Sequence, residues 1–378
     1  MNYVFEQKVK MVCGWDSVNQ LPTLLKDEGF QRPLVVCDQV VRQMGLLERL
    51  ERLLKEAGIE AVVFDQVQPD PPAPVIDAGA ALCREQHCDC VVAVGGGSTI
   101  DTAKGINLLR ANEGEILDYA GGKSYRPASG LISIPTTAGT GSELSNGMIV
   151  TDPDSAQKLA IIAYGDFTIL DPALTATMPA SLTVNTGLDV FSHAFEAYTS
   201  VLSNPMADAV CEKIMAEVYR WLPAAKADGA DRTARQRMAV AASLGGWMLS
   251  NACAHVGHSL AHVLGAKFHM PHGLVCAYTL PVTMETIAPA VPEKVRYAGE
   301  VLGVQFAGTE TPQEIGAMTA QAYRRFRDGL LDGKAVTFPI DADNIEALAE
   351  EVVTEAFVGL TPLKVDLPLA EQMLRHIF

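Results

Sequence analysis

The first ~180 residues alternate short apolar runs with stretches of helical periodicity, and this alternation constrains the fold more than any other feature. The runs predicted as strands are 33–38 (PLVVCD), 61–65 (AVVFD), 90–97 (CVVAVGGG), 131–137 (LISIPTT) and 148–152 (MIVTD). Amphipathic stretches at 43–58 and 75–86 separate the first three runs. Because a strand–helix–strand unit places its strands in parallel, the pattern predicts a mostly parallel sheet with helices on both faces.

The pattern changes after Ser181, where helical periodicity continues without strand runs between the helices. The clearest stretches are 182–200, 207–222 and 235–252. We therefore expect an α/β domain over residues 1–180 and an all-helical domain over 181–378, with Ser181 as the N-cap of the first helix.

Composition excludes several classes of protein. A net charge of −16 disfavours binding to nucleic acid or to an anionic membrane surface. No run approaches the roughly 18 apolar residues of a spanning helix, and the N-terminal residues lack the apolar core of a signal peptide. The eight cysteines are scattered along the chain, which favours reduced thiols and a cytoplasmic location.

Two glycine-rich loops that follow strands are candidates for binding phosphate. In residues 91–105 (VVAVGGGSTIDTAKG), Gly96 and Gly97 let the backbone approach an anion at a helix start, and Ser98 with Asp101 has capping-box spacing. The alternative is a tight turn alone, because the sequence is not G-x-G-x-x-G. The second loop, PTTAGTGSE (135–143), carries four hydroxyls, from Thr136, Thr137, Thr140 and Ser142. Two such loops in an open α/β sheet suggest a dinucleotide site.

Asp38 ends the first predicted strand, where a carboxylate can bind a ribose hydroxyl. The same charge would repel a 2′-phosphate, so Asp38 favours NAD over NADP. A helix-capping role for this residue is an equally good interpretation.

Five of the eight histidines fall in the segment HVGHSLAHVLGAKFHMPHG, at 255, 258, 262, 269 and 272. His258 and His262 are four residues apart, as are Asp189 and His193 in GLDVFSHAFEAYTS, so each pair shares a helix face. One carboxylate with three imidazoles suits Fe²⁺, Zn²⁺, Mn²⁺ or Co²⁺. A divalent cation beside a dinucleotide would assist alcohol oxidation, because it stabilises the ionised hydroxyl while an imidazole relays the proton.

Taken in order, VGGGSTIDTAKG, PTTAGTGSE, GLDVFSHAFEAYTS and HVGHSLAHVLGAKFHMPHG resemble the iron-dependent (group III) alcohol dehydrogenases over essentially the whole chain. The resemblance implies a dehydroquinate synthase-like fold: an α/β nucleotide-binding domain followed by an all-α metal-binding domain. It also implies a divalent metal, with Fe²⁺ favoured over Zn²⁺ or Mn²⁺. The implied ligands are Asp189, His193, His258 and His272, with His262 as a proton relay.

For NAD, the resemblance assigns the adenosine ribose to Asp38 and the pyrophosphate to the loop at 96–98. Thr136, Thr137, Thr140 and Ser142 would follow the phosphates and nicotinamide, and Lys158 would contact a ribose. Asp70, where relatives often have Asn, is only a weak candidate. A structural role is expected for His255 and is favoured for His269, for which lining the pocket is the alternative. A packing role is expected for Cys276, which lies near the position where relatives often have Asn.

The function implied is an NAD-dependent alcohol dehydrogenase or aldehyde reductase acting on a small substrate. Alternatives are the glycerol dehydrogenase or maleylacetate reductase branch, whose ligand sets differ, and a dehydroquinate synthase-like lyase, which would need more basic residues. A homo-oligomer, such as a homodimer, is expected by the same resemblance. The alternating N-terminal residues 1–12 could pair between subunits.

Overall fold

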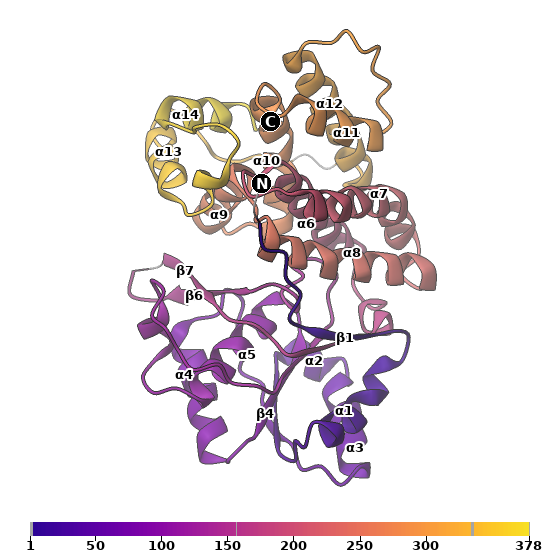
Figure 1. The fold of residues 1–378 in the computed structure, drawn as a ribbon, viewed down its shortest axis with the longest axis vertical. Helices are drawn as coiled ribbons and strands as arrows, with labels where there is room; N and C mark the ends of the chain where they lie inside the picture. The colour runs from indigo at the N-terminus through magenta and orange to yellow at the C-terminus, as the bar shows by residue number, and fades with distance from the viewer. Residues whose placement is uncertain (1–2, 156, 334–335, 378) are drawn as a thin grey trace. The chain divides into compact units, whose positions relative to one another are not determined.

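The computed structural model describes residues 3–155, 157–333 and 336–377. The chain divides into two compact units, Gln7–Thr177 and Met1–Glu6 with Met178–Phe378. The first contains the sheet and the second is helical (Figure 1). The predicted fold class, a mostly parallel α/β part followed by an all-α part, is therefore confirmed.

A six-stranded parallel sheet organises the first unit, in the order β1-β8-β5-β4-β2-β3. Its strands are β1 (Lys10–Cys13), β2 (Pro33–Cys37), β3 (Val62–Phe64), β4 (Cys90–Gly95), β5 (Leu131–Pro135) and β8 (Phe167–Leu170). Its helices are α1 (Leu21–Asp27), α2 (Gln39–Gln43), α3 (Leu46–Glu56), α4 (Ala73–Glu85) and α5 (Gly97–Arg110), with 3₁₀ turns at Ser17–Gln20, Ile116–Tyr119 and Pro172–Thr175.

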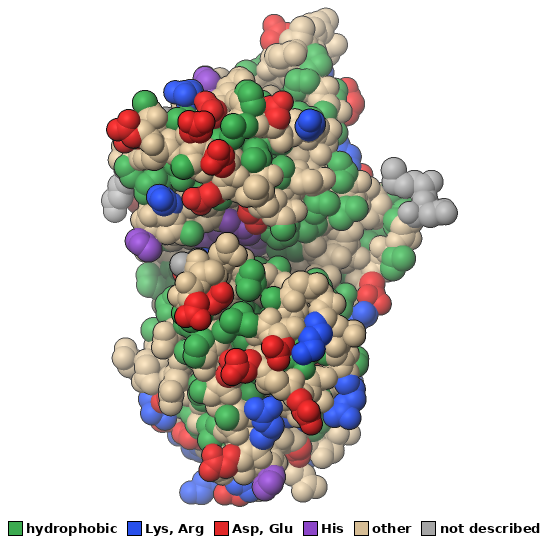
Figure 2. All heavy atoms as spheres, turned by 90° about the vertical axis from the view of Figure 1, so that its left-hand side faces the viewer, with side chains coloured by type: hydrophobic (Ala, Val, Ile, Leu, Met, Phe, Trp, Pro, Cys, Tyr) green, Lys and Arg blue, Asp and Glu red, His purple; other side chains and the backbone are tan. Residues whose placement is uncertain are grey.

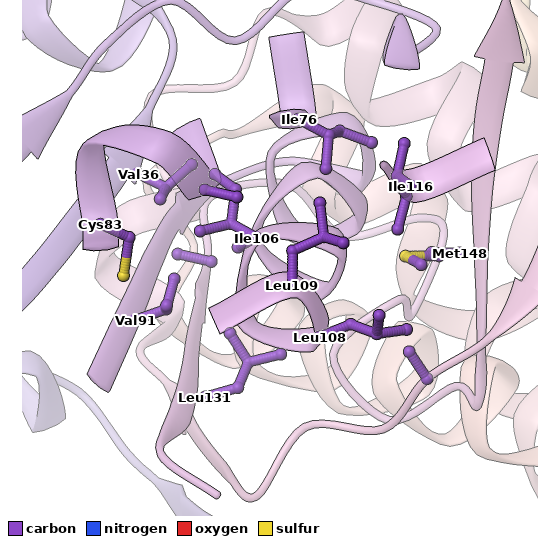
Figure 3. Packing of buried hydrophobic residues seen from close by; sticks show 14 of the residues in the cluster. Val36, Ile76, Cys83, Val91, Ile106, Leu108, Leu109, Ile116, Leu131 and Met148 are labelled. Carbon is purple, nitrogen blue, oxygen red and sulfur yellow. The ribbon is translucent and has the colours of Figure 1, made fainter. Parts of the chain in front are cut away.

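Successive residues of the central strands enter two different cores, which explains why these runs are apolar without alternation. Val36 of β2 and Val91 of β4 pack beneath α4 and α5, around Ile106 and Leu109 (Figure 3). The neighbouring residues on the same strands, Val35 of β2 and Val92 of β4, belong to a second cluster with α1 and α3. The sheet is thus covered on both faces.

Two local predictions need correction. The run at 148–152 is a strand, β6 (Gly147–Asp152), but it pairs antiparallel with β7 (Gln157–Ile162) in a separate sheet. Only four residues connect these strands, too few for a parallel crossover. The helix predicted over 43–58 begins later, at Leu46, because Gly45 has φ 71° and separates α3 from α2. Lys10–Cys13, which overlap the N-terminal stretch expected to pair between subunits, form β1 and pair with β8 of the same chain, while pairing between subunits stays a prediction.

The second unit contains nine α-helices among the described residues: α6 (Ala180–Thr199), α7 (Pro205–Ala227), α8 (Arg232–Asn251), α9 (Val256–Phe268), α10 (His272–Ile287), α11 (Pro292–Val301), α12 (Pro312–Leu330), α13 (Ile345–Thr354) and α14 (Leu367–Arg375), with a 3₁₀ turn at Val358–Leu360. Ser181 is not the N-cap of α6, because the helix already begins at Ala180 after Pro179. The residue before a proline is disfavoured in helical conformation, so Pro179 fixes the start.

Charged side chains are mixed on the surface. On the face drawn in Figure 2, Asp and Glu are interspersed with Lys, Arg and apolar side chains. Among the described residues, no helix is long and apolar enough to span a membrane.

Candidate functional site

Four side chains from three helices of the second unit converge on one point. Asp189 and His193 lie one turn apart on α6, and the other two are His258 on α9 and His272 at the start of α10. One potential ligand atom from each lies within 4.8 Å of the others. The Asp189 carboxylate is central, because its Oδ1 lies 3.6, 3.7 and 3.6 Å from the Nε2 atoms of His193, His258 and His272.

These distances fit a shared cation better than they fit direct hydrogen bonds. Two ligands, each about 2.1 Å from a tetrahedral ion, stand about 3.4 Å apart, whereas an N–H···O bond is about 2.9 Å long. Asp189 Oδ1 and His258 Nε2 are buried and have no hydrogen-bond partner. Since buried polar atoms are normally satisfied, the unpaired atoms indicate a missing positive partner between them.

The protonation of two of the three histidines also suits metal binding. Burial lowers the pKa of His193 to about 4 and that of His272 to about 3. Both imidazoles are therefore neutral near pH 7 and present a lone pair. Burial alone would raise the pKa of Asp189, but the three histidines hold it below its ordinary value, so the carboxylate is ionised. Burial alone would lower the pKa of His258, but its neighbours Cys276, Glu196 and Asp189 raise it well above the ordinary value, so this imidazole must give up a proton when it binds a cation.

Close packing at Gly273 keeps His272 in place. A Cβ at this position would lie 2.3 Å from the backbone O of Asn185 and 3.0 Å from Cβ of Asp189. Only glycine lets α10 begin this near to α6, which carries two of the four side chains.

We expect Gly273→Ala to lower the free energy of unfolding by about 1–3 kcal/mol, because the new methyl forces α10 away from α6. It should also weaken metal binding through the displacement of His272. Urea unfolding and metal titration would measure the two effects. Gly329→Ala in α12 is the matched control, since nothing lies within 4 Å of its added Cβ. Equal stability of the two variants would contradict the packing argument.

His262 lies beside the four-residue cluster and has a carboxylate partner of its own. Its ring stacks on His272 with centroids 5.3 Å apart, and its Nδ1 lies 2.8 Å from Glu355 Oε1. The other oxygen of Glu355 accepts from Ser259 Oγ at 2.6 Å and from the backbone N–H of Phe357 at 2.8 Å. Nothing in the sequence indicates Glu355 as this partner, because 93 residues separate it from His262.

The charge on Glu355 should make stability depend on pH. Burial raises the pKa of Glu355, but hydrogen bonds from His262, Ser259 and Phe357 together lower it to about 2. A carboxyl whose pKa is lower in the folded state stabilises the fold above the unfolded value, about 4.5, and loses that contribution as the pH falls toward 2.

We therefore expect the stability difference between the parent and Glu355→Gln to shrink by about 1–3 kcal/mol between pH 6 and pH 3, at about 1.4 kcal/mol per pKa unit. Urea unfolding of both metal-free proteins across this range measures it. A difference that is constant with pH would show that the pKa of Glu355 is not shifted.

The other two histidines of the segment, His255 and His269, and the nearby Cys276 are expected to have structural or packing roles. His255 is fully buried, with its Nε2 2.9 Å from Thr199 Oγ1. His269 is exposed and ends α9 with φ 51°. Cys276 is buried with its Sγ 3.5 Å from His272 Nε2, and burial raises the pKa of this thiol to about 12, so it stays protonated.

In the first unit, the two glycine-rich loops are in contact. A Cβ on Gly96 would lie 3.2 Å from Thr137 Oγ1, and one on Gly97 would lie 2.8 Å from Thr140 Cγ2. Thr136 donates its N–H to the backbone O of Gly95 at 2.9 Å. The start of α5, with its free N–H groups, therefore lies directly against the hydroxyl-rich loop, and this arrangement can bind an anion.

The predicted roles of Ser98 and Asp101 at this helix start are partly wrong. The N-cap of α5 is Gly96, so Ser98 is a helical residue and does not form a capping box. Asp101 faces inward, where one carboxylate oxygen accepts from Ser142 Oγ and the other from the backbone N–H of Ile149 at 3.0 Å. Both Asp101 and Ser142 are thus engaged within the unit.

A buried lysine of α5, which is not among the predicted site residues, binds the loop at 145–147. Lys104 is 1% exposed, and its Nζ donates to the backbone O of Gly147 at 2.6 Å and of Ser145 at 3.0 Å. Burial lowers its pKa to about 8, although the negative charges of Asp101 and Glu143 oppose that shift. The network fixes the loop relative to the helix.

Asp38 and Lys158 already have partners within the protein. Asp38 is the N-cap of α2, and its side chain accepts from the backbone N–H of Val41 at 2.8 Å. The helix-capping role predicted for Asp38 is therefore confirmed. Lys158 on β7 pairs with Asp70 Oδ1 at 2.6 Å. Neither contact tests a role in cofactor binding.

Known proteins are similar to this chain over nearly its whole length. Residues 8–172 match the model of iron-containing alcohol dehydrogenases, and residues 183–377 match the C-terminal part of the same family. An NAD-dependent methanol dehydrogenase from Bacillus methanolicus is 33% identical over 91% of this chain and 93% of its own length. Alcohol dehydrogenase 4 of Saccharomyces cerevisiae is 36% identical, with 80% of each chain covered.

The structural comparison agrees. A crystal structure of 1,3-propanediol oxidoreductase covers 100% of both chains with a TM-score of 0.93 and 29% identity. The fold is therefore the dehydroquinate synthase-like fold expected from the sequence. Together, these matches show that the chain belongs to the iron-containing alcohol dehydrogenase family and is an oxidoreductase that acts on alcohols.

Proposed function

We propose that the protein is an NAD-dependent, metal-dependent dehydrogenase that interconverts a small primary alcohol and its aldehyde. The observation that carries the proposal is the buried Asp189 oxygen facing three imidazole nitrogens at 3.6–3.7 Å. The divalent metal would be held by Asp189, His193, His258 and His272. The family favours Fe²⁺ as this metal, and the ligand types also suit Zn²⁺ or Mn²⁺. When bound, the metal would supply Lewis-acid stabilisation of an ionised hydroxyl.

The protein's own groups would provide binding and proton transfer. His262, held at Nδ1 by Glu355, would receive the hydroxyl proton at Nε2 and pass it on. In the other unit, Gly96, Gly97 and Ser98 at the start of α5 would bind the pyrophosphate of NAD. Thr136, Thr137 and Thr140 would donate hydroxyls along the cofactor, and Lys158 would contact a ribose. Asp101 and Ser142, which bond to each other, would support this loop and stay candidates for cofactor binding.

Anaerobic purification, metal analysis and an assay at 340 nm test the proposal. With Fe²⁺ bound, the protein should oxidise NADH in the presence of short aldehydes and form one alcohol per NADH. A chelated sample should regain the activity when Fe²⁺ is restored. Tight binding of NADH and metal without turnover of any aldehyde or alcohol would contradict the dehydrogenase assignment and favour a lyase of the same fold.

Asp38 is expected to set the choice between NADH and NADPH. We expect Asp38→Asn to lower the NADH:NADPH ratio of kcat/KM by about tenfold, since it removes a like-charge repulsion of about 1.4 kcal/mol. Asn can still cap α2, so the helix is preserved. Asp65→Asn is the control, because it removes one carboxylate charge from a different residue of the same unit, the partner of Arg42. An unchanged ratio would reject the role of Asp38.

We further propose that the enzyme is a cytoplasmic homo-oligomer, such as a homodimer. All eight cysteines are free, as a reducing compartment requires. A homo-oligomer is expected from the family alone. Size-exclusion chromatography with light scattering at several concentrations tests it, and a monomer at all concentrations would reject it.

A further inference from the structure

Glu196, a buried carboxylate that is not among the proposed metal ligands, contacts one of them directly. It lies on α6, three residues after His193, and is 1% exposed. Its Oε1 lies 2.6 Å from His258 Nδ1, on the side of the ring opposite the nitrogen that faces Asp189. Because an ionised carboxylate only accepts hydrogen bonds, the proton between these atoms belongs to Nδ1, so in the neutral imidazole the lone pair is on Nε2.

The second oxygen of Glu196 holds the start of the helix that carries His258. Oε2 accepts from the backbone N–H of His255 at 2.8 Å and from that of His258 at 3.1 Å. These are the N-cap and N3 positions of α9, whose N-cap side chain makes no capping bond. In a capping box two side chains satisfy these two donors, whereas here a single carboxylate from another helix accepts from both.

The packing around the carboxylate leaves no room for adjustment. A Cβ on Gly257 would lie 2.6 Å from Glu196 Oε1 and 2.9 Å from Thr283 Oγ1. Glycine at this position lets α9 approach α6 closely enough for all three bonds. Asp189, His193 and Glu196 recur at the spacing of one helix face, so α6 supplies two ligands and the partner of a third.

We propose that Glu196 is a positioning residue of the metal centre, which selects the tautomer of His258 that can bind the metal and fixes α9 against α6. The inference rests on the proposed function, because it requires that His258 is a ligand. Partners of this kind orient ligating imidazoles and raise their basicity in metalloproteins, and their loss costs about 10–100-fold in affinity.

Glutamine at this position cannot reproduce the three contacts. If its oxygen faces the two backbone N–H groups, its amide donates to His258 Nδ1 and selects the tautomer with the proton on Nε2, which cannot bind metal. If its oxygen faces Nδ1–H, the amide hydrogens face two backbone donors. Either orientation weakens the site, although the side chain keeps its size.

The test measures Zn²⁺ affinity of purified, metal-free protein by competition with a chromophoric chelator. We expect Glu196→Gln to bind Zn²⁺ about 10–100-fold more weakly than the parent. Glu355→Gln is the matched control, because Glu355 also accepts from a histidine Nδ1 of α9, a hydroxyl and a backbone N–H, but its histidine is not a proposed ligand. We expect this control to retain the parent affinity, so an equal loss in both variants would overturn the specific role of Glu196.

Two further results keep the outcomes separate. If the parent itself binds no Zn²⁺, the proposed function fails; if the parent binds and Glu196→Gln binds equally well, only the role of Glu196 fails. Should Glu196→Gln not fold, the proton spectrum of the metal-free parent with ¹⁵N-labelled histidine decides. We expect a downfield resonance from His258 Nδ1–H that is lost in His258→Asn, and a proton on Nε2 instead would overturn the inference.

Discussion

Replacing Asp189 with Asn is expected to abolish metal binding and, with it, catalysis. Asp189 is the one anion among the four proposed ligands, and its Oδ1 faces all three histidines. An amide of the same shape removes that charge and brings a donor group toward neutral imidazoles. We expect metal affinity to fall at least about 100-fold, which is more than the loss typical of a residue that only hydrogen-bonds to a ligand. The rate constant kcat/KM should fall about 10³-fold, which corresponds to about 4 kcal/mol of lost transition-state stabilisation.

Metal content by elemental analysis and steady-state assays at saturating metal would measure these losses. Asp208→Asn is a matched control in the same unit, since Asp208 on α7 pairs with Lys294 and makes no contact with the four ligands in the described structure. The control should retain its metal. A fully loaded and active Asp189→Asn protein would remove the basis of the proposed function.

Replacing His262 with Asn should slow turnover while leaving the metal in place. His262 is a quarter exposed, lies against His272 and is oriented by Glu355, which suits a group that passes a proton onward. We expect kcat to fall about 10²–10⁴-fold, the usual contribution of a positioned acid or base. Metal content should match the parent, because His262 is not a proposed ligand.

His269→Asn supplies the comparison. His269 lies seven residues further along the same segment, is exposed, and adopts a left-handed conformation that Asn tolerates. We expect its kcat to equal that of the parent. If His262→Asn instead loses metal and keeps kcat per bound metal, His262 is a ligand and the assignment of the proton relay is wrong.

The local part of the site could be predicted from the sequence. Asp189 and His193 share a helix face because they are four residues apart, and the glycines at 96–97 fall where a buried strand turns into a helix. Backbone periodicity determines both features, and periodicity is visible in the sequence. The same reasoning failed at Ser98 and Ser181, where capping chemistry alone did not locate the helix starts.

Partners that are distant along the chain could not be predicted. Glu355 lies 93 residues from His262, and Glu196 lies 62 residues from His258. Lys104 is a charged residue of α5, yet it is buried and binds the loop at 145–147. No spacing in the sequence indicates which carboxylate approaches which histidine, because that depends on how the helices pack.

The sequence by itself thus determined the fold class, the order of the two parts and the residue types at the site, since these follow from the periods of strands and helices and from motif spacing. Only the tertiary structure decided how the histidines differ. His258 is buried between Asp189 and Glu196, His262 contacts Glu355, and His255 is enclosed beside Thr199. The physical reason is that an imidazole's role is set by the groups facing its two nitrogens, and packing between helices supplies those groups.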